Sequence, residues 1–365
     1  MATESTNSYD ASSSKRLFLV SCPRTASNLL VKVLALTKQP EVRINERGGY
    51  VLWDAFISTN LDGRMFKPLD QWTATDKAKL QKQCQQCLDE LEQSSAAAQR
   101  EGKMFVTKEH ASWFQNMSAI QQYLYGENVI DDEHPCTLQY PDAYGVPQNP
   151  QYSPDNQTFF ADEYLRTWRA AFIIRHPALV FPSAQRALAN LLKEEMDPEI
   201  LQRSISINMT FRWARRLFDF FQEQTETTPA VLDANDLINS PLVVAKFSKI
   251  IGMDPSQLQF EWDTQARKDN TGQSTEEERR QQMEAFMLST LHSSSGLVKD
   301  KAPSHIDLAV EAAKWKTEFG DRVASMLEKA VVAAMPDYEY LTARRVQLDG
   351  VEDSPSKMFA AESRA

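Results

Sequence analysis

Short apolar segments alternate with longer amphipathic stretches along this chain, and that alternation limits the folds it can adopt. Four segments are apolar and of strand length: Leu17–Val20, Met104–Thr107, Ala171–Ile174 and Ala230–Leu232. Five stretches have helical periodicity: Asn28–Leu36, Ala74–Gln99, Pro182–Leu192, Ile207–Gln224 and Leu242–Ile251. Strands that alternate with helices are typical of a parallel sheet with crossover helices. We therefore predict an α/β fold in which a central parallel sheet is flanked by helices.

The length and composition fit one such domain with short extensions. A chain of 365 residues, 42% of them hydrophobic, can cover both faces of a sheet with helices. We predict a disordered N-terminus over residues 1–14, the α/β domain over residues 15–345 and a flexible tail over residues 346–365. Residues His134–Pro154 are rich in Pro, Tyr, Asn and Gln, which predicts a long loop of the kind that often contacts a substrate.

The net charge and the N-terminal sequence limit the classes of partner that we expect the chain to bind. The formal net charge of −10 argues against broad binding of nucleic acid or an anionic membrane, although it permits a local basic pocket. The N-terminus is polar, no apolar run has the length of a membrane span, and four cysteines form no disulfide framework. We expect a cytoplasmic protein with a small-molecule substrate and no nucleic-acid or membrane partner.

The first candidate site follows the first strand, where the chain reads SCPRTASN before a helical pattern begins. A tight strand-to-helix loop leaves backbone N–H groups unpaired at the positive end of the helix dipole, and such groups bind anions. Thr25, Ser27 and Asn28 add side-chain donors, and Arg24 adds a planar cation suited to phosphate or sulfate. The alternative is that Ser27 is simply the N-cap of an ordinary helix. The loop GxxxxGK[ST] is absent, which argues against an ATPase or GTPase.

A second candidate site follows the third strand, in the segment AFIIRHPALVFPSAQRA. Arg175 stands at the carboxyl end of the strand, and Ser183 follows eight residues later. Ligands of open parallel sheets lie beyond the carboxyl ends of the strands, so both side chains are candidates for an anion site. The alternative is an arginine that caps a strand end and a serine that begins a helix.

The third candidate site ends the second strand, where MFVTKEH places three titratable residues in a row. A neutral imidazole near its ordinary pKa suits removal of a proton from a hydroxyl, which makes His110 a candidate general base. Lys108 could stabilise charge on a transferring group. Glu109 is an alternative base, or a residue that orients His110.

Together these segments resemble the sulfotransferases. PRTASNLL is similar to their 5′-phosphosulfate loop, P-[KR]-[ST]-G-[ST]-[ST]-x-L, at five positions: Pro23, Arg24, Thr25, Ser27 and Leu30. Ala26 stands where that loop has glycine, so it adds a methyl group and resists a positive φ. Asn28 replaces a common hydroxyl residue. The family also has a strand that ends in Arg-x-Pro with a serine eight residues later, and a strand that ends in Lys-x-His.

The resemblance implies a cosubstrate and roles for these residues. 3′-Phosphoadenosine 5′-phosphosulfate (PAPS) would donate sulfuryl to a hydroxyl of a small metabolite, without a metal, as in the small-molecule sulfotransferase-like proteins of fungi and bacteria that serve secondary metabolism. Residues Arg24 to Asn28 would hold the phosphosulfate, and Arg175 and Ser183 the 3′-phosphate. His110 would be the base, and Arg24 and Lys108 would offset charge on the leaving oxygen.

Two departures from the family leave other functions open. Besides Ala26, the family's late Arg-Lys-Gly stretch is missing, and its nearest counterpart is Ser293–Gly296 with Lys299 and Lys301. The same fold without PAPS could therefore do acid–base chemistry on an anionic metabolite, such as cyclisation, elimination or hydrolysis. A non-catalytic binding module is a third alternative. For the sulfotransferase hypothesis we expect an acceptor pocket that includes His134–Pro154 and residues near Trp53 and Trp113.

Two further patterns favour structural roles. Cys84 and Cys87 form a C-x-x-C pair inside a helical pattern, but no second pair exists to complete a zinc site. Arg212, Arg215 and Arg216 stand among aromatic residues that suit the buried face of an amphipathic helix. These arginines could line an acidic pocket or pair with surface carboxylates.

Overall fold

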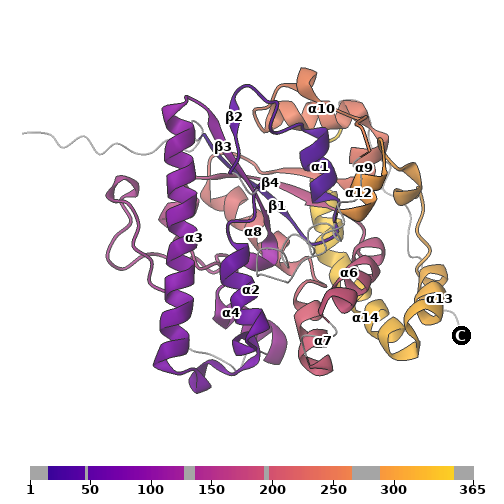
Figure 1. Ribbon diagram of the computed structural model, residues 1–365, viewed down its shortest axis with the longest axis horizontal. Helices are drawn as coiled ribbons and strands as arrows, with labels where there is room; N and C mark the ends of the chain where they lie inside the picture. The colour runs from indigo at the N-terminus through magenta and orange to yellow at the C-terminus, as the bar shows by residue number, and fades with distance from the viewer. Residues whose placement is uncertain (1–14, 46–47, 127–135, 193–196, 265–287, 349–365) are drawn as a thin grey trace, which may run out of the picture.

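The computed structural model describes residues 15–45, 48–126, 136–192, 197–264 and 288–348. The predicted disordered N-terminus, and residues 349–365 of the predicted tail, lie outside the described residues. Five parallel strands form one sheet in the order β2-β3-β1-β4-β5. The strands are β1 (Arg16–Ser21), β2 (Val42–Arg43), β3 (Met104–His110), β4 (Arg169–Ile174) and β5 (Ala230–Asp233). The predicted α/β fold is confirmed, and Figure 1 shows the sheet among its helices.

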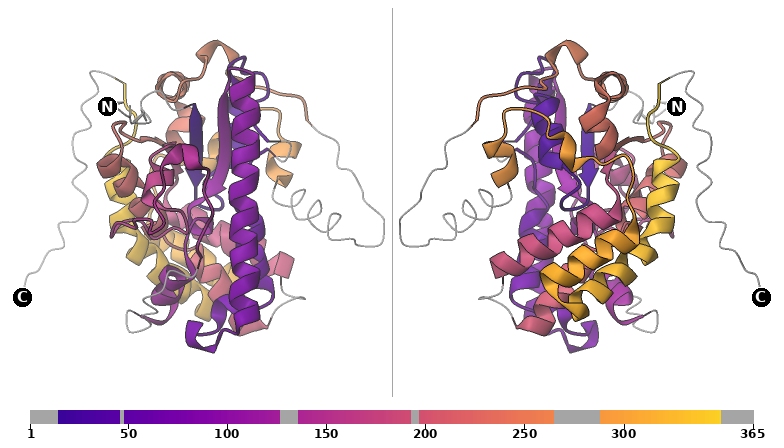
Figure 2. Two further views of the ribbon diagram at one scale, coloured as in Figure 1. Left: turned by 90° about the vertical axis from the view of Figure 1, so that its left-hand side faces the viewer. Right: turned by 90° about the vertical axis from the view of Figure 1, so that its right-hand side faces the viewer.

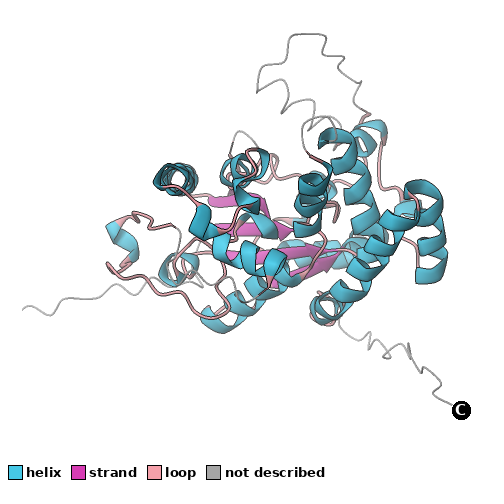
Figure 3. Cartoon of the chain, turned by 90° about the horizontal axis from the view of Figure 1, so that it is seen from below, coloured by secondary structure: helices cyan, strands magenta, loops and turns pink. Residues whose placement is uncertain are grey.

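The helices cover both faces of the sheet, as the view in Figure 3 shows. Their bounds are α1 (Ser27–Val33), α2 (Trp53–Leu61), α3 (Ala74–Arg100), α4 (Met117–Tyr125), α5 (Asp162–Leu165), α6 (Pro177–Leu192), α7 (Pro198–Ile207), α8 (Arg212–Gln224), α9 (Ala234–Asn239), α10 (Pro241–Ile250), α12 (Ser289–Ser293), α13 (Leu308–Phe319) and α14 (Asp321–Thr342). Helices α6, α13 and α14 pack against one another (Figure 2). In the part of the chain that the structure describes, no helix is both long and apolar enough to cross a membrane.

The two faces of the sheet bury separate apolar layers. Leu17 and Leu19 of β1 pack with residues of α1, α9 and α10, whereas Phe18 and Val20 pack with residues of α3, α8 and α14. This division follows from the strand period of two, which sends successive side chains to opposite faces. Strand β1 is therefore buried on both sides, and it holds a fixed position between β3 and β4.

Strand register brings the candidate sites to one edge. Ser21, the last residue of β1, is paired with His110 on one side and with Ile173 on the other. The loop after β1, the end of β3 and the residue that follows β4 are consequently neighbours. Parallel strands put their carboxyl ends together, which is where open α/β sheets bind ligands.

Three predicted helix boundaries are wrong. Helix α1 ends at Val33 and not at Leu36. Helix α6 begins at Pro177 and contains Pro182, because Pro177 suits the first helical position and the N–H of Ala178 is satisfied by Nδ1 of His176 (3.2 Å). The stretch predicted as one helix, Ile207–Gln224, is broken by a turn over residues 208–211. There the Thr210 hydroxyl accepts from the N–H of Arg212 (3.0 Å), so α8 starts at Arg212.

The first residues of the predicted tail contact the sheet. The N–H of Val346 donates to the carbonyl of Val231 (2.8 Å), and Val346 and Leu348 pack against the layer that contains α1 and α10. Strand β2 had no counterpart in the sequence pattern, because two residues are too short to produce a periodic signal.

Candidate functional site

The loop between β1 and α1 holds two residues with left-handed backbone. Arg24 has a φ of 72° and Ala26 a φ of 67°. Ala26, not Ser27, is the N-cap of α1, and it supplies no side-chain hydrogen bond to the helix. Thr25 is buried, and both its N–H (3.3 Å) and its hydroxyl (2.8 Å) donate to the carbonyl of Cys22. The loop is thus closed by Thr25, and the interpretation of Ser27 as a capping residue is wrong.

The left-handed conformation of Ala26 makes a stability prediction possible. An L-residue with a side chain pays about 1–2 kcal/mol in that region, whereas glycine does not. Against this, glycine increases the entropy of the unfolded chain by about 0.4–1 kcal/mol. We expect Ala26→Gly to raise the free energy of unfolding by about 0.5 kcal/mol, measured by urea denaturation. Ala96→Gly, on the exposed face of α3, should instead lower it by about 1 kcal/mol, and equal losses in both variants would contradict the strain argument.

The structure brings Arg24, Arg175 and Ser183 together. Nε of Arg24 donates to Oγ of Ser183 (3.0 Å), and Nη1 of Arg175 donates to the carbonyl of Arg24 (3.3 Å). Ser183 lies inside α6 rather than at its start. The first loop, the end of β4 and α6 therefore meet at one place, as a shared anion site requires.

The turn Lys299–Lys301 also reaches this place. Nη2 of Arg175 donates to the carbonyl of Lys301 (2.7 Å). The segment Ser293–Gly296 does not contact Arg175 in this way. Nε1 of Trp262 donates to the carbonyl of Ser294 (2.9 Å). The segment lines a cavity of about 1400 Å³, which Lys32 also lines. Of the predicted late segment, it is Lys301 that the structure places against Arg175.

Like charges are held close together in the site. Burial lowers the pKa of Arg24, and the neighbouring Arg186 lowers it further while Tyr50 opposes the change. Burial also lowers the pKa of Arg175, with the charge of Arg24 as the next cause. Guanidinium groups that repel each other in a partly buried place are stabilised by an anion, because the anion offsets both the repulsion and the lost hydration.

Lys108 and Asn28 connect the first loop to β3. Nζ of Lys108 donates to Oδ1 of Asn28 and lies 4.0 Å from the centre of the Tyr50 ring. Gly49 makes this arrangement possible: its φ is +109°, and an added Cβ would lie 2.8 Å from the backbone nitrogen of Lys108. The chain therefore needs glycine at position 49 to bring Tyr50 against the end of β3.

His110 is buried at the carboxyl end of β3. Its Nδ1 lies 2.8 Å from Oγ of Ser21, and its ring centre lies 4.4 Å from that of Trp113. Burial lowers its pKa well below 6.5; the charge of Lys108 lowers it further, the Ser21 backbone partly opposes this change, and the charge of Arg24 adds to it. The imidazole is therefore neutral at pH 7, the form that accepts a proton.

Glu109 points to the opposite side of β3 from its two neighbours, as the strand period dictates. Its Oε1 accepts from the N–H of Val51 (2.7 Å) and from the Thr107 hydroxyl (2.9 Å), and its Oε2 accepts from the N–H of Leu52 (3.3 Å). Burial raises its pKa to about 8 although these donors lower it. These contacts place the carboxyl group at the start of α2, not beside the imidazole.

Aromatic side chains pack beside His110. Trp113 lies at the centre of this group, with its ring 5.0 Å from Tyr50, 5.0 Å from Trp53 and 6.1 Å from Phe56. The segment around Trp53 is held by Glu109 through the backbone before α2. Of the two tryptophans expected near an acceptor pocket, Trp113 lies against His110 and Trp53 packs against Trp113.

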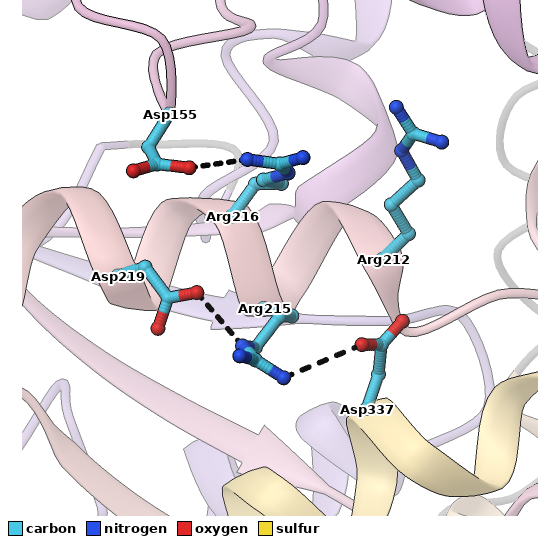
Figure 4. A pocket seen from close by; sticks show the side chains of 6 residues that line it. All are labelled: Asp155, Arg212, Arg215, Arg216, Asp219 and Asp337. Atoms are coloured by element: carbon cyan, nitrogen blue, oxygen red, sulfur yellow. Dashed lines mark hydrogen bonds and ion pairs between the residues drawn. The ribbon is translucent and has the colours of Figure 1, made fainter.

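A separate cavity of about 500 Å³ lies on the polar face of α8, where six charged side chains line it (Figure 4). Arg215 pairs with Asp219 (2.7 Å) and Asp337 (3.6 Å), and Arg216 pairs with Asp155. The aromatic side chains on the other face of α8 are buried, as predicted. All three arginines line the cavity, and Arg215 and Arg216 also pair with carboxylates, so both alternatives hold for those two.

The cysteines are buried thiols. Cys84 and Cys87 lie on the inner face of α3, and Sγ of Cys136 lies 3.3 Å from Sγ of Cys84. Within the described ranges, no three His, Cys, Asp or Glu side chains are grouped so that they could hold a metal ion.

The fold and the site define an α/β protein whose strand ends bring cationic groups and a neutral imidazole to one edge of a parallel sheet. No family model matches the chain. Sulfotransferase ppzF of Metarhizium rileyi is 34% identical over 348 residues, and sulfotransferase ppzF of Metarhizium majus is 35% identical over 347 residues. Each alignment covers 92% of this chain and 97% of the relative. The chain belongs to the sulfotransferases and is a sulfotransferase-like transferase.

Among solved structures, the sulfotransferase domain from the curacin biosynthetic pathway matches 83% of this chain and 96% of that domain. The sequence identity is 13% and the TM-score is 0.37, a likeness too loose to support an argument.

Proposed function

We propose that this chain transfers the sulfuryl group of PAPS to a hydroxyl group of a small metabolite. The observation that carries the proposal is the contact of Arg24 with Ser183 and Arg175, one strand away from His110. That contact joins the phosphosulfate loop to the pair expected for the 3′-phosphate, and membership of the sulfotransferases supports the same reading.

The nucleotide would bind along the carboxyl edge of the sheet. The guanidinium of Arg175 has the planar donor geometry that suits a phosphate, and the hydroxyl of Ser183 adds a neutral donor. The backbone of the loop from Arg24 to Asn28 would hold the phosphosulfate, with Ser27 contributing its hydroxyl. In this structure Thr25 closes the loop, so its contribution is to shape it.

The acceptor oxygen would attack sulfur in line with the bridging oxygen. A bond forms between sulfur and the acceptor oxygen, and the bond to the bridging oxygen breaks. His110 takes the proton of the acceptor hydroxyl, and the nucleotide leaves with the electron pair as 3′-phosphoadenosine 5′-phosphate (PAP). Arg24 and Lys108 offset the charge that develops on the bridging oxygen.

Binding of PAP tests this function directly. Isothermal titration calorimetry of the purified chain should show saturable binding of PAP below millimolar concentration, and labelled sulfuryl from PAPS should appear in an acceptor product. Failure of millimolar PAP to bind would remove the proposal.

Ala26 favours one alternative, in which the same site binds another anion without PAPS. Its methyl group stands in the loop where the family has glycine. His110 would then serve acid–base chemistry such as cyclisation, elimination or hydrolysis. A sulfated product formed from labelled PAPS would exclude this alternative.

A further inference from the structure

Ser21 makes two polar contacts at the end of β1. Its Oγ lies 2.8 Å from Nδ1 of His110 and 3.2 Å from the carbonyl oxygen of Glu109, to which it donates. Ser21 is 1% exposed, so water does not compete for these contacts. The pairing of Ser21 with His110 in the β1–β3 ladder fixes their separation, and the geometry is therefore a property of the sheet.

The two contacts of the Ser21 hydroxyl decide which tautomer of His110 is compatible with them. A serine hydroxyl has one proton to donate and lone pairs that accept. When that proton goes to the carbonyl of Glu109, the hydroxyl oxygen must accept from an N–H at Nδ1 of His110. In the other tautomer Nδ1 has no proton and accepts a hydrogen bond from the Ser21 hydroxyl. The hydroxyl then has no proton left to donate to the carbonyl of Glu109. Both buried contacts are satisfied only when Nδ1 carries the proton.

The surroundings of His110 agree with this assignment. Burial, Lys108 and Arg24 lower the pKa of the ring, so it carries a single proton at pH 7. The Ser21 backbone partly opposes this lowering.

We propose that Ser21 is a positioning residue that keeps Nδ1 of His110 protonated and leaves Nε2 as the basic nitrogen. The inference rests on the proposed function, in which His110 removes the acceptor proton. That proton would move to Nε2, and the resulting imidazolium would keep its Nδ1–H bond to Ser21. A hydroxyl on the neighbouring strand thereby does what a carboxylate does for the histidine of a serine protease, which is to set the tautomer.

The tautomer can be measured without any substrate. In protein with ¹⁵N-labelled histidine, long-range ¹H–¹⁵N correlations distinguish Nδ1–H from Nε2–H, and the signals lost in His110→Gln identify the residue. We expect the Nδ1–H form in the wild-type chain, a shift towards Nε2–H in Ser21→Ala, and recovery in Ser21→Thr. A wild-type His110 protonated at Nε2 would overturn the proposal.

Kinetics supply the second measurement. Ser21→Ala should lower kcat by about 10- to 100-fold, part of the 10²–10⁴ that general base catalysis contributes, while the KM for PAPS and the affinity for PAP stay within about twofold. Ser21→Thr should restore kcat. Ser248→Ala is the matched control, because it removes another buried serine hydroxyl, on α10. Equal kinetic losses in both alanine variants would refute the assignment. Absence of sulfuryl transfer in the wild-type chain would reject the proposed function, and the NMR result would still decide the role of Ser21.

Discussion

His110→Gln should lower kcat for sulfuryl transfer by about 10²- to 10⁴-fold, the range that a positioned general base contributes. Glutamine keeps the polarity and approximate size of the side chain, but it has no nitrogen that can take up a proton at neutral pH. The affinity for PAP should remain within about twofold, because the nucleotide is expected to contact Arg24, Arg175 and Ser183 instead. Stopped-assay kinetics with labelled PAPS and calorimetry with PAP measure the two quantities.

The control for this variant is His305→Gln, since His305 is exposed. It should leave kcat unchanged. A His110→Gln enzyme with wild-type kcat would assign the base elsewhere, and a loss of PAP affinity would show instead that His110 binds the nucleotide.

The pH dependence follows from the lowered pKa of His110. In the free protein His110 loses its catalytic form only when it is protonated, so kcat/KM for PAPS should fall only below pH 6.5. Bound PAPS adds negative charge beside the ring and raises its pKa, and the acid limb of kcat should therefore lie at higher pH than the limb of kcat/KM. An acid limb of kcat/KM centred above pH 6.5 would contradict the buried, neutral imidazole.

Arg175→Ala should weaken PAP binding by about 30- to 1000-fold, which corresponds to loss of about 2–4 kcal/mol from a partly buried charge pair. The loss should depend on the 3′-phosphate. Adenosine 5′-phosphate lacks that group, so its affinity should change much less, and the variant should bind the two nucleotides almost equally. Calorimetry with both nucleotides on both proteins forms a double-mutant cycle between Arg175 and the phosphate.

The matched control is Arg169→Ala. Arg169 begins the same strand at its other end, and its Nη2 donates to the carbonyl of Ile250 (2.8 Å). This variant removes a guanidinium from β4 without touching the site, and both affinities should stay unchanged. If Arg175→Ala weakened the binding of both nucleotides equally, Arg175 would support the loop through its bond to the Arg24 carbonyl and would not contact the 3′-phosphate.

Much of the fold could be predicted from the sequence, because strands and helices produce patterns of apolar residues within short segments. Short apolar runs predicted β1, β3, β4 and β5, since a parallel strand that is covered on both faces favours apolar residues at successive positions. The residues at the ends of those runs, among them Arg175 and His110, could be chosen because the end of a run is visible in the sequence. Helix boundaries were less certain, as α6 shows: two prolines suit its start, and only packing decides between them.

The sequence did not predict which side chains contact one another. Glu109 and His110 are adjacent in the chain, but they lie on opposite sides of β3, where one holds the start of α2 and the other meets Ser21. Ser21 had no signal of its own, because a serine that ends a strand is common. Its importance arises from the strand order, which puts β1 beside β3.

By itself, the sequence determined that this chain forms a parallel α/β sheet and which residues stand at the strand ends, because burial and periodicity act within a few residues. Only the tertiary structure decided that Arg24 bonds to Ser183, that Arg175 reaches Lys301, and that Ala26 takes a left-handed backbone. These features depend on the order and register in which distant strands pair, and that choice minimises the free energy of the whole fold rather than of any one segment.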